Sequence, residues 1–298
     1  MALGEEQRET RLAAALREGE FVVSVQLDPP LGGSSRGLLE VAAELESSGL
    51  VPFVDVNDNA TARAGINALM VSCAIERATG LETIPHLTTR DSSVLGIESQ
   101  LLGAHSEGVR NVLAVTGDPP EVGDYPGSQG VYEIDSIGLT RLIAGLNRGE
   151  DFNGRPIDAP TSFFVGVAVN HNADDPDEEA ARLRAKVAAG AAFAMSQIAY
   201  DLDELVRFGE AAGGFGVPLL VGVFPLTSYR LALRLHNEVP GIVVPHALQD
   251  ALEAAGPDAA AIGMAHAREL IAAAREAFQG VYVVAPYRKP TSVLELLA

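Results

Sequence analysis

The sequence predicts an α/β protein built as a single (β/α)₈ barrel, or TIM barrel, with an extra helix at its N-terminus. Short runs of β-branched and apolar residues alternate with longer segments of helical periodicity, a rhythm typical of βαβ units and a parallel sheet. The length of 298 residues suits one such barrel, and a hydrophobic content of 47% is enough for its large core.

Eight segments carry the strand pattern, and several are continuous apolar runs, as expected for parallel strands that are buried on both faces. We expect strands at residues 21–27, 53–56, 83–87, 111–115, 163–169, 193–198, 219–224 and 281–285. Helical patterns lie between them, at residues 37–48, 62–79, 136–147, 178–189, 203–212 and 258–278.

The two ends of the chain are expected to lie outside the barrel. Residues 1–20 hold a helical pattern at 5–18, which we expect to cap the bottom of the barrel, and residues 287–298 form a tail after a barrel at 21–286. Residues 241–245 are a rival eighth strand. Because a long helical pattern separates them from residues 281–285, we place them in a connection or a short extra strand.

Composition excludes several classes of function. The net charge of −19 argues against a nucleic-acid-binding protein and against an anionic membrane surface as a partner. The N-terminal segment is charged and lacks the apolar core of a signal peptide, so we expect a cytoplasmic protein. The single cysteine, Cys73, rules out a disulfide framework, and the six histidines show no metal-binding spacing.

Polar side chains follow seven of the predicted strands, at the ends where barrel enzymes build their sites. Taken singly, most of them are explained by turn formation or by a satisfied core histidine; a glutamine within a strand is harder to explain, because a buried amide needs partners for both of its ends. A long loop at 117–131 follows the fourth strand at this face, whereas the loop at 149–161 lies at the opposite face and is expected to be structural. The polar residues include Gln26, Asp28, Asn57, Asp58, Asn59, His86, Thr116, Asp118, Asn170 and Gln197.

Several of these strand ends resemble the methylenetetrahydrofolate reductase family. The similar segments are DPP at 28–30, PHLT at 85–88, NVLAVTGDPP at 111–120, and Lys186 through Gln197. The resemblance runs in order from residue 21 to about residue 286, and it is strongest from 101 to 139. There the chain looks like the reductase half of bacterial proteins that also carry a homocysteine methyltransferase half.

The resemblance implies FAD bound non-covalently across the rim of the barrel, and a ping-pong reaction. A reduced nicotinamide, NAD(P)H, reduces the flavin, and 5,10-methylenetetrahydrofolate then takes the hydride and becomes 5-methyltetrahydrofolate. By motif position, Asp118 lies near the flavin and the pterin, where a carboxylate tunes the flavin potential, and Gln197 hydrogen-bonds the folate. The implied FAD contacts are Asn57, His86, Thr116, Gly117, Asp118, Tyr132, Ser136 and Lys186.

One departure from the family pattern concerns the general acid. The glutamate expected to assist opening of the methylene bridge is replaced by Gln26, which has no transferable proton. Asp28 lies two residues on, on the same face of the strand, and is one candidate for the role. The alternatives are a slow enzyme, a changed substrate, or a deliberate substitution that traps a complex.

Three functions therefore compete. The first is the folate reductase, which the resemblance suggests is a homo-oligomer and which has a separate homocysteine methyltransferase as a possible partner. The second, motivated by Gln26, is a folate- or flavin-binding subunit with little or no folate turnover. The third is an unrelated barrel enzyme such as an aldolase or lyase; we rank it last because neither of the two lysines, Lys186 and Lys289, ends a predicted strand.

Overall fold

The computed structural model describes residues 9–286 and 289–298, and the strands within them form a closed parallel barrel in the order β1-β2-β3-β4-β5-β6-β7-β8. This confirms the predicted fold class. The strands are β1 (Val22–Leu27), β2 (Phe53–Val56), β3 (Glu82–Thr88), β4 (Asn111–Val115), β5 (Phe164–Val169), β6 (Phe193–Ile198), β7 (Leu219–Val223) and β8 (Gly280–Val283).

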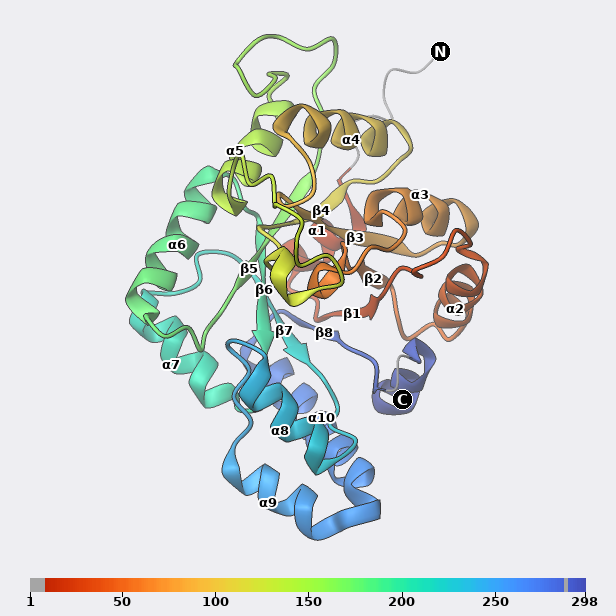
Figure 1. Ribbon diagram of the computed structural model, residues 1–298, viewed down its shortest axis with the longest axis vertical. Coiled ribbons are helices and arrows are strands. Elements are labelled where there is room, and N and C mark those ends of the chain that lie inside the picture. Colours follow the sequence, from red (N-terminus) through yellow and green to blue (C-terminus); the bar gives the residue numbers. More distant parts are fainter. Residues whose placement is uncertain (1–8, 287–288) are drawn as a thin grey trace.

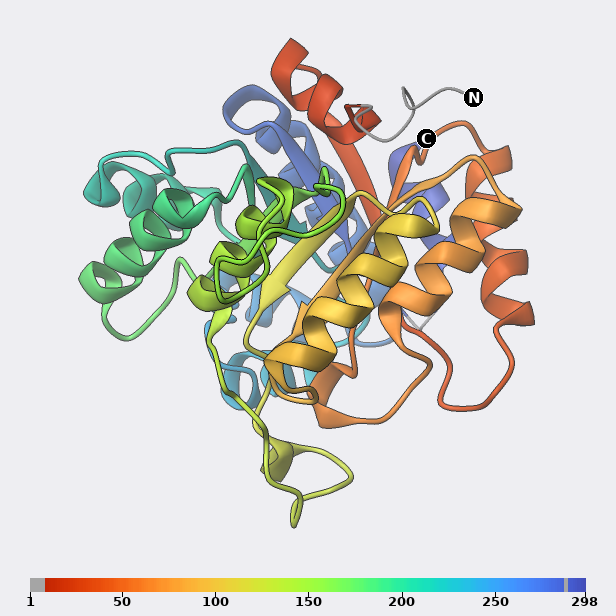
Figure 2. The same cartoon turned by 90° about the horizontal axis from the view of Figure 1, so that it is seen from above.

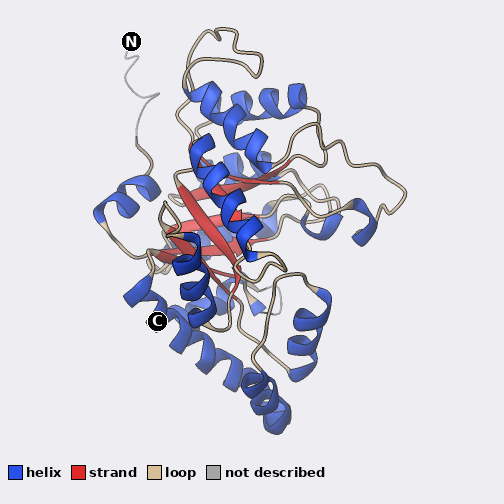
Figure 3. Ribbon diagram, turned by 90° about the vertical axis from the view of Figure 1, so that its left-hand side faces the viewer, coloured by secondary structure: helices blue, strands red, loops and turns tan. Residues whose placement is uncertain are grey.

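Helices surround the strands on the outside, as Figures 1 and 3 show. The helices are α1 (Arg11–Glu18), α2 (Arg36–Ser47), α3 (Ala68–Ala78), α4 (Val94–Ser106), α5 (Ser136–Asn147), α6 (Pro176–Ala189), α7 (Leu202–Ala212), α8 (Tyr229–Glu238), α9 (His246–Ala255), α10 (Ala259–Ala277) and α11 (Leu294–Leu297). Short 3₁₀ turns are η1 (Ala60–Ala62), η2 (Pro120–Val122), η3 (Gly256–Asp258) and η5 (Pro290–Val293).

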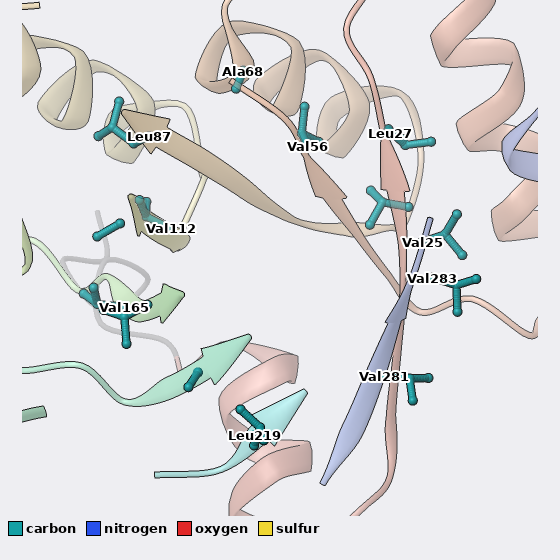
Figure 4. Close-up of a cluster of buried hydrophobic side chains, with 14 of the residues drawn as sticks. Val25, Leu27, Val56, Ala68, Leu87, Val112, Val165, Leu219, Val281 and Val283 are labelled. Atoms are coloured by element: carbon teal, nitrogen blue, oxygen red, sulfur yellow. The ribbon is translucent and has the colours of Figure 1, made fainter. Parts of the chain in front are cut away.

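The larger of two buried apolar clusters joins the outward faces of the strands to the helices. Alternate residues of a strand point to opposite faces, so Val23, Val25 and Leu27 of β1 all enter this layer. Figure 4 shows part of it, including Val25 and Val56 from neighbouring strands. The cluster also contains Cys73, whose thiol is free and buried.

The second cluster joins large side chains inside the barrel to residues of the helices α1, α8, α9 and α10. Phe193 is fully buried and stacks on Phe164, with ring centroids 5.2 Å apart. A side chain at Gly166 would collide with this ring, since a Cβ there would lie 2.3 Å from it. Above this layer the inward positions become polar, with Ser24 on β1, Asp55 on β2 and His86 on β3. The apolar plug therefore forms the floor on which a polar site is built.

The predicted strands are confirmed to within one or two residues at their ends, and residues 239–245 form a connection between α8 and α9, without a strand. The helix predicted at 62–79 is wrong in its start. The chain forms η1, with a left-handed backbone at Asn59, Thr61 and Ala62, and the helix begins only after Asn67, whose side chain caps it. The N-terminal helix runs from Arg11, and positions 5–8 of that prediction lie outside the described residues.

The two long loops lie where the sequence placed them. The loop after β4 carries η2 and projects away from the barrel, as the yellow-green segment of Figure 2 shows. The loop at 149–161 precedes β5 and is closed by an isolated antiparallel bridge between Glu150 and Pro156. Only the first of them is therefore at the face where the strands end.

Two classes of feature are missing from the described part of the chain. None of its helices combines the length and apolar character needed to cross a bilayer. Nor do its residues include a group of three or more histidine, cysteine or acidic side chains that could hold a metal ion.

Candidate active site

A cavity of about 390 Å³ lies at the carboxyl ends of the strands, inside the mouth of the barrel. We call it the mouth cavity. Seven of the residues predicted from the sequence line it, although they come from seven separate parts of the chain, at or just after β1, β2, β3, β4 and β6 and in α5 and α6: Gln26, Asn57, His86, Thr116, Ser136, Lys186 and Gln197. Asp28, Gly117, Asp118 and Tyr132 do not line it.

A second cavity, of about 670 Å³, lies beside the first, between the ends of β1 and β2 and the C-terminal segment near Pro290. We call it the side cavity. Gln26 and Asn57 line both cavities, and Asp28 lines only the side cavity. The amide of Asn57 donates a hydrogen bond of 2.6 Å to the Asp28 carboxylate, which is exposed. Asp28 is therefore held at the side of the site by a neutral partner.

His86 lies at the floor of the mouth cavity, against a fully buried carboxylate. Its Nε2 atom is 3.6 Å from Oδ2 of Asp55, and neither atom has a hydrogen-bond partner. The other carboxylate oxygen, Oδ1, accepts a hydrogen bond of 2.6 Å from the hydroxyl of Ser24. Asp55 therefore faces one good donor and one imidazole, a sparse set for a buried charge.

Lys186 brings a buried cation to the opposite side of the mouth cavity. Its ammonium group donates a hydrogen bond of 2.7 Å to the carbonyl of Ala168 and lies 3.8 Å from the Glu179 carboxylate. Glu179 also accepts from the backbone N–H of Asn170, at 3.1 Å. Burial lowers the pKa of Lys186 and the Glu179 charge opposes that shift. An ammonium has three donors, so Lys186 keeps one for a ligand.

The side-chain amide of Gln197 finds hydrogen-bond partners for both of its ends in the backbone. Its amide nitrogen donates to the carbonyl of Pro240, at 3.1 Å, and its oxygen accepts from the N–H of Ile198, at 2.9 Å. A primary amide has two donors and two acceptor lone pairs. One donor and one acceptor of Gln197 therefore remain for a ligand, in an orientation that the backbone fixes.

Thr116 and Ser136 join the end of β4 to the start of α5. The N–H of Ser136 donates to the Thr116 hydroxyl at 3.3 Å, and the side chain of Asp135 caps the helix. Gly117 follows with a φ of +90°, and a Cβ there would lie 3.0 Å from the Thr88 side chain. A glycine is therefore needed for the chain to turn from β4 into the rim.

Asp118 is held on the rim by a cluster that sequence analysis did not single out. Its carboxylate accepts a hydrogen bond of 3.0 Å from the N–H of Thr61, and its carbonyl accepts from Arg90 and from the Tyr132 hydroxyl. Arg90 is 3% exposed and also donates to the carbonyl of Asn59. The loops after β2, β3 and β4 are thus tied together at one side chain.

The pKa values of two carboxylates near Arg90 are shifted in opposite directions. Asp91 receives two hydrogen bonds of 2.7 Å from the guanidinium, which lower its pKa. Burial raises the pKa of Asp58, although Thr88 donates to this carboxylate through both its N–H and its hydroxyl. Arg90 has a single close carboxylate partner in Asp91, and its other donors point to backbone carbonyls.

His171, at the end of β5, gives the protein a predicted pH dependence. Burial lowers its pKa to about 4, and its Nε2 lies 3.2 Å from the amide of Asn172. The unfolded chain takes up this proton near pH 6.5, so the folded state loses stability as the pH falls from about 6.5 to about 4, by about 3 kcal/mol.

Urea unfolding at several pH values between 7 and 4 measures this effect, with His171→Asn as the variant that removes it. The native protein should lose more stability over this range than the variant does. His105, whose pKa burial also lowers to about 4, is present in both proteins and cancels in the comparison. Equal pH dependence in the two proteins would contradict the prediction.

Four residues that shape the site were not predicted: Asp55, Arg90, Glu179 and Tyr282. Asp55 had a readable signal, because it alternates with Phe53 and Asn57 along β2, so all three share the inward face. Arg90 and Glu179 had no such signal in the sequence. Arg90 bonds the carbonyl of Asp118 and Glu179 bonds the N–H of Asn170, and both contacts exist only in the folded backbone.

Comparisons with known proteins identify the family of this chain. A reductase named methylenetetrahydrofolate reductase 1, from Schizosaccharomyces pombe, is 28% identical over 206 residues, which are 67% of this chain and 32% of that protein. The 5,10-methylenetetrahydrofolate reductase of Salmonella typhimurium is 26% identical over 219 residues, covering 73% of this chain and 69% of that protein. The chain thus spans about a third of the first relative and about two thirds of the second.

Among solved structures, an uncharacterized protein from Clostridium thermocellum that binds two copies of 5-methyl-5,6,7,8-tetrahydrofolic acid aligns with 97% of this chain and 98% of its own. The TM-score is 0.62 and the sequence identity is 11%, a likeness that shows the fold alone. A sequence model of methylenetetrahydrofolate reductase matches residues 11–284, nearly the whole barrel. The chain therefore belongs to the methylenetetrahydrofolate reductase family.

Proposed function

We propose that the protein reduces 5,10-methylenetetrahydrofolate to 5-methyltetrahydrofolate, with NAD(P)H as the hydride source and FAD as the bound carrier. The observation that carries this proposal is the mouth cavity, where seven residues matched to the family's motifs meet from seven separate parts of the chain. The names of the curated relatives support the same reaction.

The residues around the mouth cavity fit a flavin nucleotide. Thr116 and Ser136 offer hydroxyl groups, Asn57 offers an amide and His86 an imidazole. Lys186 offers a cation for a phosphate. Local donors of this kind are required, because the net charge of −19 repels an anionic ligand. When bound, FAD supplies a redox ring that accepts a hydride from a nicotinamide and returns it to the folate.

The remaining residues are proposed to bind the folate. Gln197 offers its free donor and acceptor to the amide edge of the pterin, and Asp118 accepts from the pterin's amino group from its place on the rim. Gln26 positions the folate by hydrogen bonds, since a primary amide carries no proton that it can transfer. Asn57 holds Asp28 and borders both cavities, so it orders the entrance to the site.

Gln26 favours one alternative, a folate- or flavin-binding subunit that turns over folate slowly or not at all. In that case the nicotinamide would still reduce the flavin, because only the folate step needs an acid. The two functions therefore differ in one half-reaction and agree in the other.

An anaerobic spectroscopic experiment tests the proposal. The purified protein, supplied with FAD, should be yellow, should bleach when NADH or NADPH is added, and should recover its colour with methylenetetrahydrofolate. Tetrahydrofolate, which lacks the methylene bridge, is the control and should leave the protein bleached. A protein that takes up no FAD would overturn the proposal. Bleaching without recovery would support the binding subunit instead.

A further inference from the structure

The proposed reaction consumes a proton that no residue described so far supplies. The product carries its methyl group on N5, so the bond between the methylene carbon and N10 of the folate must break. Its electron pair stays on N10, which takes up a proton. The carbon becomes an iminium and then accepts the hydride that the nicotinamide provides. Gln26 stands where the family's acid is expected and cannot provide this proton.

Asp55 and His86 are the unexplained pair nearest to this position. Gln26 and Asp55 are register partners on neighbouring strands, and Asp55 is fully buried. Its Oδ2 atom and Nε2 of His86 are both buried without a hydrogen-bond partner, yet they lie 3.6 Å apart and belong to opposite classes of group. A proton on Nε2 would satisfy both atoms at once.

We propose that Asp55 and His86 form a dyad in which His86 donates the proton for folate ring opening and Asp55 positions and charge-balances the imidazole. This inference rests on the proposed function and names a further catalytic residue for it. Asp55 holds the proton on Nε2, so the proton that reaches the folate nitrogen leaves from Nδ1 and is replaced from solvent. A buried carboxylate plays the same orienting part toward histidine in other enzymes.

The other polar groups near Asp55 and His86 are already paired elsewhere, so His86 is the partner that remains for the Asp55 carboxylate. Tyr282, from β8, donates its hydroxyl proton to the carbonyl of Ser196, at 2.7 Å, and burial together with the Asp55 charge raises its pKa, so it stays neutral. Lys186, Arg182 and Glu179, from α6, line the same cavity, but both cations already face the Glu179 carboxylate, at 3.8 Å and 3.7 Å.

Asp28, the rival acid, lies in a different setting. It is exposed and accepts a hydrogen bond from Asn57. It lines the side cavity but not the mouth cavity. His86 is 13% exposed and lines the mouth cavity together with Gln26 and Gln197. The pair is therefore enclosed enough to hold a proton and open enough to deliver one.

Kinetics of the two half-reactions test the dyad. In Asp55→Asn and in His86→Gln, folate reduction should fall about 10²–10⁴-fold more than nicotinamide oxidation does, as expected for a lost acid. Asp250→Asn, an exposed acid on α9, is the control for a lost carboxylate.

Gln26→Glu provides the decisive rescue. Introduced into Asp55→Asn, it returns an acid to the family's position and should restore folate reduction, whereas in the native background it should change the rate only a few-fold. Circular dichroism verifies that each variant is folded. The dyad is overturned if folded Asp55→Asn and His86→Gln reduce folate at the native rate, if Asp28→Asn alone abolishes the step, or if the rescue fails.

A measurement on the ligand-free protein separates this inference from the proposed function. In protein labelled with ¹⁵N-histidine, His86 should carry a slowly exchanging proton on Nε2 that is lost in Asp55→Asn, with His86→Gln identifying the signal. Native protein with this signal and no folate turnover would refute the reductase and leave the proton-holding pair in place. An Nε2 without a proton would overturn the dyad even in an active reductase.

Discussion

Replacing Lys186 with methionine is expected to weaken FAD binding by about 10- to 150-fold, the equivalent of one charge-assisted hydrogen bond of about 1.5–3 kcal/mol. Lys186 is one of two lysines in the chain, and its side chain is 6% exposed at the wall of the mouth cavity. Methionine keeps the length and apolar stem of the side chain but removes the cation. The fold should persist, because Arg182 remains 3.7 Å from the Glu179 carboxylate.

Lys289→Met is the matched control for this experiment. Lys289 is exposed near the C-terminus and is not among the residues that line either cavity. Titration of each apoprotein with FAD, followed by quenching of flavin fluorescence, gives the two dissociation constants. The control should bind as the native protein does. Equal binding by Lys186→Met would show that the phosphate groups are held elsewhere.

Replacing Arg90 with methionine is expected to lower the free energy of unfolding by about 1–3 kcal/mol, the usual cost of leaving a buried hydrogen-bond acceptor without its partner. The Asp91 carboxylate is 40% exposed, so its loss of the guanidinium adds little. The substitution removes the bidentate contact with Asp91 and the hydrogen bonds to the carbonyls of Asn59 and Asp118. The Asn59 carbonyl would then lose its Arg90 donor, and Asp118 would lose one of the three hydrogen bonds, from Thr61, Arg90 and Tyr132, that hold it on the rim.

The Arg63→Met variant tests whether burial, and not charge alone, explains this loss. Arg63 also joins two rim loops, through Asp124 at 3.4 Å, but both side chains are about half exposed, at 47% and 56%. Such surface pairs contribute about 0–1 kcal/mol. Urea unfolding of the three proteins measures the difference. An Arg90→Met protein as stable as Arg63→Met would contradict the buried-cluster interpretation.

The fold was predictable because the barrel repeats one pattern. Each strand needs apolar residues on both faces, and this requirement is visible in local runs such as residues 219–223 of β7. The start of α3 was not predictable from periodicity, because residues 62–67 share its apolar pattern but hold a rim turn. That turn is fixed by Thr61, whose N–H donates to Asp118, a residue 57 positions away.

Part of the candidate site was predictable, because the carboxyl ends of all the barrel strands meet at one face. Position alone brings Gln26, His86 and Gln197 to one cavity, whatever their chemistry. Asp118 also follows β4, but it lines neither cavity and lies exposed on the rim, where its carboxylate accepts from the N–H of Thr61. Arg90 likewise looked like one charged loop residue among several, and only its burial in the fold distinguishes it.

The two cavities meet at a pair of neutral amides, Gln26 and Asn57. A boundary lined by two side chains can be widened or narrowed by a single substitution. Enlarging Asn57 would divide the space into two separate binding compartments, whereas shrinking it to alanine would merge them. The length of molecule that the protein accommodates is thus under the control of one residue, independently of the chemistry at the barrel floor.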